Sequence, residues 1–308
     1  MPSRSRGLTA SWLLGLTLAH VGALVLVWWI FIRTRHGQLL DTVAFSGNVL
    51  GQTHVHGLVT RVLDVISVLS LALATGIIGF IALARRRVML AMVATLLVAG
   101  ANLTTQALKH ALIHRPDLGI DSDVVGVNSL PSGHTTVAAS VAVALVLVLP
   151  PRLRGTTALL GACYAALTAV ATLSAGWHRP SDAVAALIIV GGWAAGGGLL
   201  LVLAQDDHAV VTSDEAHPYA VSLLAFAGLA LLAVGLAAVW LADPGVGAQV
   251  AGLSRRRMVA AYAGSAVGIA GTACLMMMFA LVTVHRVVPR RLRGARPPEA
   301  RARVGASA

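Results

Sequence analysis

The chain has 308 residues, of which 57% are hydrophobic and 11% are charged. Soluble domains usually carry about 25% charged residues, so this composition excludes an ordinary water-soluble globular domain and indicates a polytopic membrane protein. The net charge of +11 lies in loops and in the C-terminal tail, and no basic face with interleaved aromatic residues is evident, so we expect no nucleic-acid partner.

Apolar segments follow one another along the whole chain. A helix crosses the membrane core with about 20 apolar residues, and a spanning segment must satisfy its own backbone polar groups. We therefore expect an all-α fold, a polytopic bundle of eight membrane helices. The shortest segment ends at two consecutive prolines and is retained because an odd number of spans would disturb the charge pattern. The expected spans are residues 11–32, 62–84, 88–108, 134–150, 156–176, 183–204, 218–242 and 258–284.

Polar residues gather in the connections between these spans. The first long connection, residues 33–61, is mildly apolar, contains Asp41, and could hold an interfacial helix or a lid. With the N-terminus in the cytoplasm, 14 arginines fall on the inner side and nine Lys and Arg residues on the outer side. The arginine triplet at 255–257 conflicts with this orientation, but all three polar motifs then share the outer face.

The first motif considered is Pro-Ser-Gly-His at residues 131–134, at the start of an expected span. Gly133 permits a backbone turn that is closed to other residues, and Ser132 can cap the helix that follows. The free amide groups at the start of that helix carry partial positive charge and form a site for an anion. His134 lies at the rim of this site and can serve as a general acid or base.

The second motif lies in residues 177–182, before the expected span 183–204. Pro180 fits the first turn of a helix, and Asp182 falls within that turn. The carboxylate can reach back to the ring of His178 and hold one ring nitrogen as N–H. The other nitrogen is then basic and correctly aimed, which is how a histidine becomes a nucleophile.

The third motif contains two cations. Lys109 is the only lysine of the chain and ends the expected span 88–108, whereas Arg115 lies on the next loop and precedes Pro116. Phosphoryl transfer needs cations around the non-bridging oxygens, where charge gathers in the transition state. Arginine offers bidentate binding and lysine a point charge, so the motif favours a phosphate-sized site.

Each motif also fits an ordinary structural role when it is taken alone. Lys109 could be an interfacial anchor, the pair His178 and Asp182 could be helix-start chemistry, and residues 131–134 could form a turn. Their occurrence together, at the ends of apolar segments and on one expected face, favours function over these alternatives.

At these residues the sequence resembles the type 2 phosphatidic acid phosphatase superfamily, whose lipid phosphate phosphatases share a site with vanadium haloperoxidases. The family pattern is K-x6-R-P, then PSGH, then S-R-x5-H-x3-D, and the resemblance covers about residues 11–204. Five residues rather than six separate Lys109 from Arg115. The family's Ser-Arg pair aligns with Ala171-Thr172, so a third phosphate-binding arginine is absent, and Arg179 is the nearest substitute.

The resemblance implies a two-step hydrolysis. His178 would attack phosphorus and form a phosphohistidine, Asp182 would orient it, and His134 would protonate the leaving oxygen and then activate water. No metal or other cofactor is implied, and the two cysteines lie inside apolar runs. The residues that would hold the phosphoryl oxygens are Lys109, Arg115, Ser132 and Gly133.

We therefore expect a six-span core at residues 1–204, two additional spans at 205–284, and a basic, disordered cytoplasmic tail at 285–308. The expected protein is an integral membrane phosphatase of a bacterial-type cell membrane, with its active site on the extracytoplasmic face. Its partners would be membrane lipids and a phosphatidate-like or polyprenyl phosphate or diphosphate substrate. The absent arginine favours one alternative, a catalytically weak relative that binds or transports a phosphorylated lipid.

Overall fold

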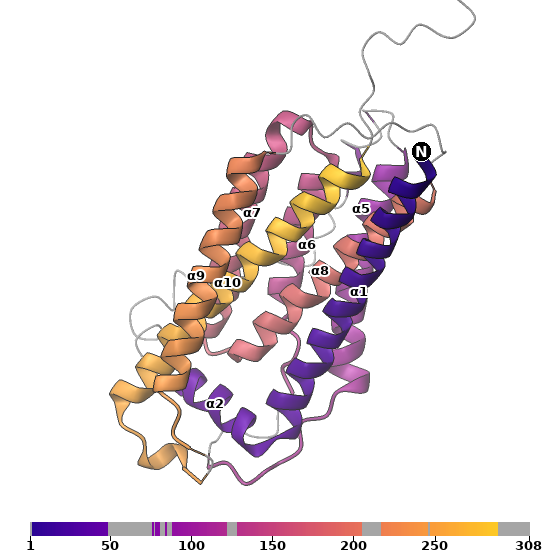
Figure 1. Ribbon diagram of the computed structural model, residues 1–308. Coiled ribbons are helices and arrows are strands. Elements are labelled where there is room, and N and C mark those ends of the chain that lie inside the picture. The colour runs from indigo at the N-terminus through magenta and orange to yellow at the C-terminus, as the bar shows by residue number, and fades with distance from the viewer. Residues whose placement is uncertain are drawn as a thin grey trace, which may run out of the picture.

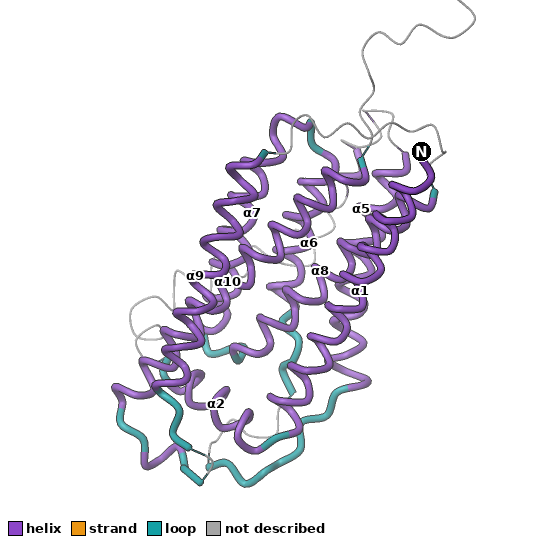
Figure 2. Tube along the Cα trace, viewed as in Figure 1, coloured by secondary structure: helices purple, strands orange, loops and turns teal. Residues whose placement is uncertain are grey.

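A computed structural model describes residues 2–48, 88–121, 128–204, 217–245 and 247–288, together with 76, 78–80 and 84. Within these ranges every regular element is a helix, and loops are found at the ends of the bundle (Figure 2). The expected all-α membrane bundle is therefore confirmed. The helices are α1 (Pro2–Arg33), α2 (Arg35–Ser46), α5 (Val88–Ala107), α6 (Gly133–Val148), α7 (Pro151–Ser174), α8 (Pro180–Leu203), α9 (Pro218–Leu241) and α10 (Arg255–Val287).

Six of the eight expected spans are helices long and apolar enough to cross a membrane. The expected span 62–84 lies almost entirely outside the described residues. The expected span 134–150 forms α6, which has only 16 residues and is about 24 Å long, short of the roughly 30 Å of a membrane core. The six helices contain Arg6–Arg33, Val88–Leu112, Pro151–Ser174, Pro180–Leu203, Pro218–Leu241 and Arg255–Val287.

The two prolines explain why α6 is short. Leu149 and Pro150 adopt extended backbone angles, and Pro151 takes the first position of α7. Proline lacks an amide proton and restricts the residue before it to extended conformations, so α6 must end before Leu149 and a new helix can begin at once.

Helix α2 lies across one end of the bundle, and α1 runs from the opposite end to meet it (Figure 1). The corner between them is the single residue Thr34, whose hydroxyl donates to the carbonyl of Ile30 and accepts from the amide of Gly37 at 3.1 Å. Gly37 is required there, because a Cβ atom would overlap the Ile30 carbonyl. The corner is therefore a tight, hydrogen-bonded elbow.

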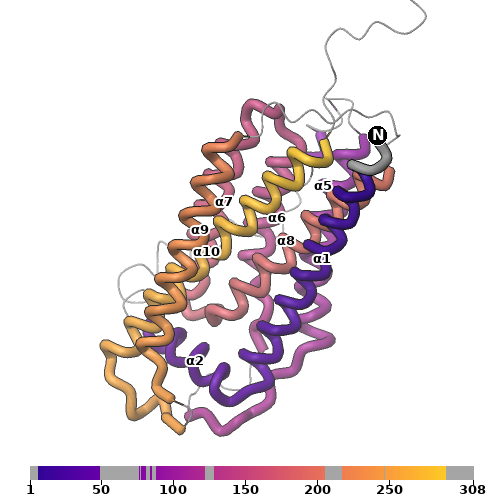
Figure 3. Tube along the Cα trace, viewed as in Figure 1, coloured from indigo at the N-terminus to yellow at the C-terminus, as the bar shows by residue number. Residues whose placement is uncertain are grey.

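All three sequence motifs lie at the end of the bundle that α2 covers, which we call the α2 end. Gln38 of α2 donates to the carbonyl of Pro116 at 3.0 Å, and Ser181 donates to Asp41 of α2. The N-terminus and the end of α10 lie at the opposite end (Figure 3). The expectation that the motif segments share one face of the bundle is thus met, and the structure does not assign that face to a side of the membrane.

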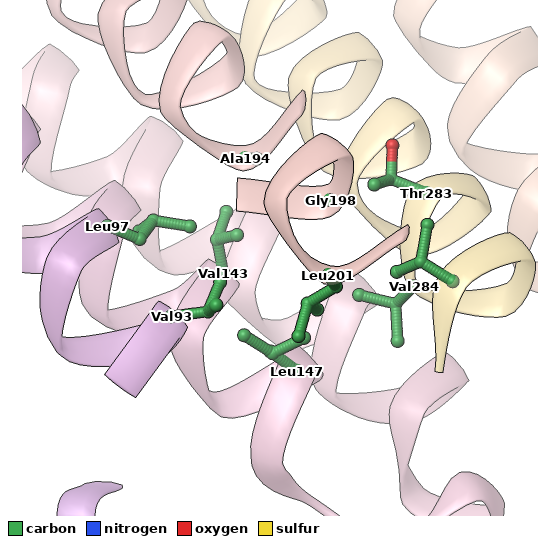
Figure 4. Close-up of a pocket in the computed structure, with 10 residues that line it drawn as sticks. Val93, Leu97, Val143, Leu147, Ala194, Gly198, Leu201, Thr283 and Val284 are labelled. Carbon is green, nitrogen blue, oxygen red and sulfur yellow. The ribbon is translucent and has the colours of Figure 1, made fainter. Parts of the chain in front are cut away.

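The interior of the bundle is closely packed around small side chains. The largest group of buried apolar residues draws on α5, α6, α7, α8 and α10, with many alanines at the contacts. A cavity between α5, α6, α8 and α10 has a volume of only about 10 Å³, near the minimum that holds one water molecule (Figure 4). This cavity is therefore too small to hold a ligand.

Helix α10 is part of this packed interior. Met277 and Leu281 of α10 are fully buried, and the hydroxyl of Tyr262 lies 2.6 Å from that of Ser174 at the end of α7. The division into a six-span core and two additional spans stays a prediction, but α10 packs against the same helices that carry the motifs. The expected tail from residue 289 onward lies outside the described residues.

Candidate active site

The Pro-Ser-Gly-His loop forms the start of α6. Ser132 is fully buried and is the N-cap residue, and its hydroxyl oxygen accepts from the amide of Thr135 at 3.4 Å and from the hydroxyl of Thr135 at 3.0 Å. The expected helix cap is confirmed. The first amide groups of α6 therefore point toward the α2 end, where their partial positive charge favours an anion.

The expected turn at Gly133 is wrong. Gly133 is the first helical residue of α6, and it is not among the described glycines with positive φ. A Cβ atom at this position would meet only the side chain of Gln106, at an ordinary 3.7 Å. Neither the backbone nor local packing requires glycine here, because any residue adopts the conformation of a first helical position. The phosphate-binding role of Gly133 stays a prediction.

The pair His178 and Asp182 has the geometry that the sequence predicted. Nδ1 of His178 lies 3.1 Å from Oδ2 of Asp182, and both side chains are buried. The same carboxylate oxygen accepts from the amide of Arg179 at 2.9 Å, and Pro180 begins α8. Because a carboxylate only accepts, Nδ1 of His178 carries the proton and Nε2 is left as the basic nitrogen.

The two histidine motifs are joined to each other. The amide of Ser132 donates to the carbonyl of Asp182 at 3.0 Å, so the start of α6 is fixed to the first turn of α8. The rings of His134 and Trp177 lie 5.4 Å apart between centroids, with a tilt of 43°. His134 therefore faces the loop that carries His178, as its expected role requires.

Arg179 points toward the same loops. Its side chain is buried, one terminal nitrogen donates to the hydroxyl of Ser129 at 3.2 Å, and the guanidinium carbon lies 5.8 Å from the ring centre of Phe45. Thr172, which stands where the family has an arginine, is fully buried and donates to the carbonyl of Ala169 at 2.8 Å. A guanidinium is thus present near the Pro-Ser-Gly-His loop, but it comes from the start of α8 rather than from α7.

Arg115 is held by a residue that the sequence motifs did not include. A terminal nitrogen of Arg115 lies 3.7 Å from Oδ2 of Asp41, and both side chains are almost completely buried. Asp41 also accepts from the amide of Ser181 at 3.0 Å and from its hydroxyl at 2.6 Å. Burial raises the pKa of Asp41 to about 6, and Arg115 opposes this shift, so the carboxyl group is mainly ionised at neutral pH. Burial likewise lowers the pKa of Arg115.

Lys109 lies in a π-helical turn, Leu108–Leu112, that continues α5 to the α2 end. Its side chain is partly exposed, and among the described residues no hydrogen bond or ion pair to its ammonium group is seen. What ties this turn to the other motifs is Asn128, which donates to the carbonyls of Lys109 and Ile113 at 3.0 and 2.9 Å. Asn128 precedes the Pro-Ser-Gly-His loop, so it joins the segment of Lys109 to that loop.

An apolar groove of about 400 Å³ lies between α1, α5 and α8. Along α8 it extends from Ile188 to Leu200, about 18 Å of helix. Its floor contains Gly196, and its few polar atoms include the Trp193 indole nitrogen, which donates to Thr104 at 3.1 Å. The groove begins roughly 12 Å along α8 from Pro180, on the helix whose first turn carries Asp182.

Comparison with known families shows which family the region that carries the motifs resembles. Residues 88–206 match the family model described as the PAP2 superfamily. This region belongs to the PAP2 superfamily. The resemblance inferred from the motifs is thereby confirmed, and the PAP2 region runs from α5 through α8 with every motif inside it. No curated protein and no solved structure gives a significant match.

PAP2 superfamily members usually hydrolyse phosphate esters. The match to this family and the apolar helices support a membrane phosphatase family for the region of residues 88–206, which is less than half of the chain. Helices α1, α2, α9 and α10 lie outside the PAP2 region, yet α2 supplies Asp41 to the site. Within the described residues no group of three His, Cys, Asp or Glu side chains is placed to hold a metal ion.

Sequence reasoning missed Asp41, Ser129, Asn128 and Ser181. For Asp41 a signal existed, because a lone carboxylate in a mildly apolar connection needs a partner when it is buried. For Ser129 and Asn128 there was none, because short polar residues in a loop before a helix are common. Only the packing of α2 against α8 shows that Ser181 faces Asp41.

Proposed function

We propose that the protein is an integral membrane phosphatase that hydrolyses a lipid phosphate at the extracytoplasmic face through a phosphohistidine on His178. The observation that carries this proposal is the buried bond between Nδ1 of His178 and Asp182, beside the capped start of α6, within a PAP2 region. This arrangement leaves Nε2 of His178 available as a nucleophile on a loop that is joined to a helix start, which favours an anion.

The reaction has two steps. Nε2 of His178 attacks phosphorus, the bond from phosphorus to the lipid oxygen breaks, and His134 gives a proton to that oxygen. Water then attacks the phosphohistidine while His134 takes its proton, so the phosphorus–nitrogen bond breaks and inorganic phosphate leaves. Asp182 stabilises the charge that the ring of His178 acquires. Arg115, Lys109 and the α6 amide groups hold the phosphoryl oxygens.

His178→Ala is expected to lower kcat for lipid phosphate hydrolysis by at least about a thousandfold, because the covalent step is lost. The wild-type protein, quenched during turnover, should carry an acid-labile phosphoryl group that the variant lacks. His114→Ala, which removes an exposed histidine at the same end of the bundle, is the matched control and should turn over normally. Near wild-type turnover in His178→Ala would falsify the mechanism.

Arg179 serves as the third cation in this proposal. Its burial and its bond to Ser129 support a role beside the Pro-Ser-Gly-His loop rather than at lipid headgroups. Arg179→Ala should lower kcat/KM by about a hundredfold or more, since loss of one preorganised donor costs about 2.7–4 kcal/mol of activation free energy. Arg255→Ala removes an exposed arginine at the α2 end and should have little effect. Equal activities of the two variants would exclude Arg179 from the site.

The groove between α1, α5 and α8 supports a lipid as the substrate. It is apolar and lies on the helix that presents Asp182, so a hydrocarbon chain in it would extend from a phosphate at the α2 end. A Cβ atom at Gly196 would meet no atom within 4 Å, so a larger side chain there fills the groove without a clash.

Gly196→Leu is therefore expected to raise KM for a long-chain lipid phosphate at least about fivefold, and to leave hydrolysis of a short, water-soluble phosphate monoester unchanged. Gly15→Leu is the control, because Gly15 of α1 also has open space around it and does not line the groove. If both substrates respond equally to Gly196→Leu, the groove does not bind the lipid chain.

The extracytoplasmic placement of the site rests on the distribution of arginines. Its test uses single cysteines in a chain from which Cys163 and Cys274 have been removed. Gly247→Cys lies in the connection at the α2 end, and Ala204→Cys lies at the far end of α8; both positions are exposed. In intact cells an impermeant thiol reagent should label position 247 and spare position 204. The reverse pattern would put the site in the cytoplasm.

One observation favours a second candidate function. Thr172 occupies the place of a family arginine, and a site with one cation fewer stabilises the transition state less. A protein that binds or transports a phosphorylated lipid would tolerate this loss. Binding of a lipid phosphate without release of inorganic phosphate, together with hydrolysis conferred by Thr172→Arg, would support that alternative.

A further inference from the structure

The buried face of α2 contacts the two segments that carry Arg115 and Arg179. Gln38, Asp41 and Phe45 are spaced by three and four residues, so they share one face of the helix. Gln38 donates to the carbonyl after Arg115, Asp41 pairs with Arg115, and Phe45 lies under Arg179. Helix α2 thus forms a floor beneath the two guanidinium groups.

Asp41 is the charged residue on this face of α2, and it pairs with Arg115. Its two oxygens accept from the amide and the hydroxyl of Ser181, at 3.0 and 2.6 Å, which fixes the carboxylate against the first turn of α8. From this fixed position Oδ2 faces a terminal nitrogen of Arg115 at 3.7 Å. We propose that Asp41 is a positioning residue of the phosphate site, which holds the guanidinium of Arg115 in the place where it receives a phosphoryl oxygen.

Burial gives this ion pair its importance. The Arg115 side chain is only 2% exposed, and a buried guanidinium without a counter-ion is costly. An arginine has five N–H donors, so one terminal nitrogen can face Asp41 while others face a ligand. Loss of the carboxylate would remove the counter-ion that lies 3.7 Å from Arg115, so the guanidinium would no longer be held in this position.

Electrostatics alone gives Asp41 the opposite effect on phosphate binding. Asp41 and Asp182 together balance Arg115 and Arg179, so an acid beside the arginines also weakens their attraction for an anion. If this masking dominated, removal of the carboxylate would strengthen phosphate binding. The two effects have opposite signs, so a binding measurement separates them.

The inference rests on the proposed function, and its test uses the full-length protein in detergent. Two quantities are measured: the Kd for inorganic phosphate, and KM with kcat for a lipid phosphate. The variants are Asp41→Asn, which keeps the size and the acceptor oxygen, Arg115→Ala, and the two combined. His36→Ala is the matched control, because it removes the ion pair between α2 and Asp243 and leaves Asp41 and Arg115 in place.

Asp41→Asn is expected to raise the phosphate Kd and the lipid KM about tenfold, close to the effect of Arg115→Ala. The combined variant should be no more than about threefold worse than Arg115→Ala alone, because both changes remove one interaction. His36→Ala should change Kd and KM less than about threefold. Asp41→Glu, which keeps the charge, should retain more phosphate affinity than Asp41→Asn and supports the same conclusion if Asp41→Asn fails to fold.

Measurement of Kd and KM distinguishes a positioning role of Asp41 from a purely structural one. A variant that only lost folded protein would show a lower apparent kcat, with Kd and KM unchanged, and that result would overturn the inference. Tighter phosphate binding by Asp41→Asn would also overturn it. So would a combined variant whose Kd rises by the product of the two single-variant factors, because the two residues would then act independently. A wild-type protein that neither binds phosphate nor hydrolyses the lipid would overturn the proposed function itself, and is recognised before any variant is compared.

Discussion

The site depends on one fully buried carboxylate, that of Asp182. Its side chain fixes the ring of His178 and the amide at the start of α8, and its backbone carbonyl receives the amide of Ser132. A carboxylate away from water must satisfy its acceptor capacity with nearby donors. The bonds of Oδ2 to His178 and Arg179, together with the backbone bond to Ser132, join the histidine loop, the start of α8 and the start of α6 at this one residue.

The sequence predicted this centre well because its chemistry is local. The interval of four residues between His178 and Asp182, with Pro180 between them, specifies a helix start and the direction of the carboxylate. Ser132 before an apolar run specifies a cap in the same way. The all-helical class followed from the apolar runs and from the requirement that a span satisfy its own backbone.

What could not be predicted depends on contacts between distant segments. The pairing of Asp41 with Arg115 joins residues that are far apart in the chain, and no periodicity of either segment encodes it. The position of Arg179 was foreseen only as a possibility, because a side chain beside a histidine can turn inward or toward lipid. Gly133 was misread because a glycine before a helix suggests a special turn, whereas a first helical position accepts any residue.

The elbow at Thr34 joins the lipid-facing helix α1 to α2, the helix that carries Asp41. Helix α1 exposes most of its spanning segment, and helices of this kind adjust their tilt to the thickness of the bilayer. A single residue with two hydrogen bonds joins α1 to α2, so the orientation of α1 constrains that of the helix that bears Asp41. Under the proposed function, the tilt of the lipid-facing helix would therefore bear on the position of Arg115.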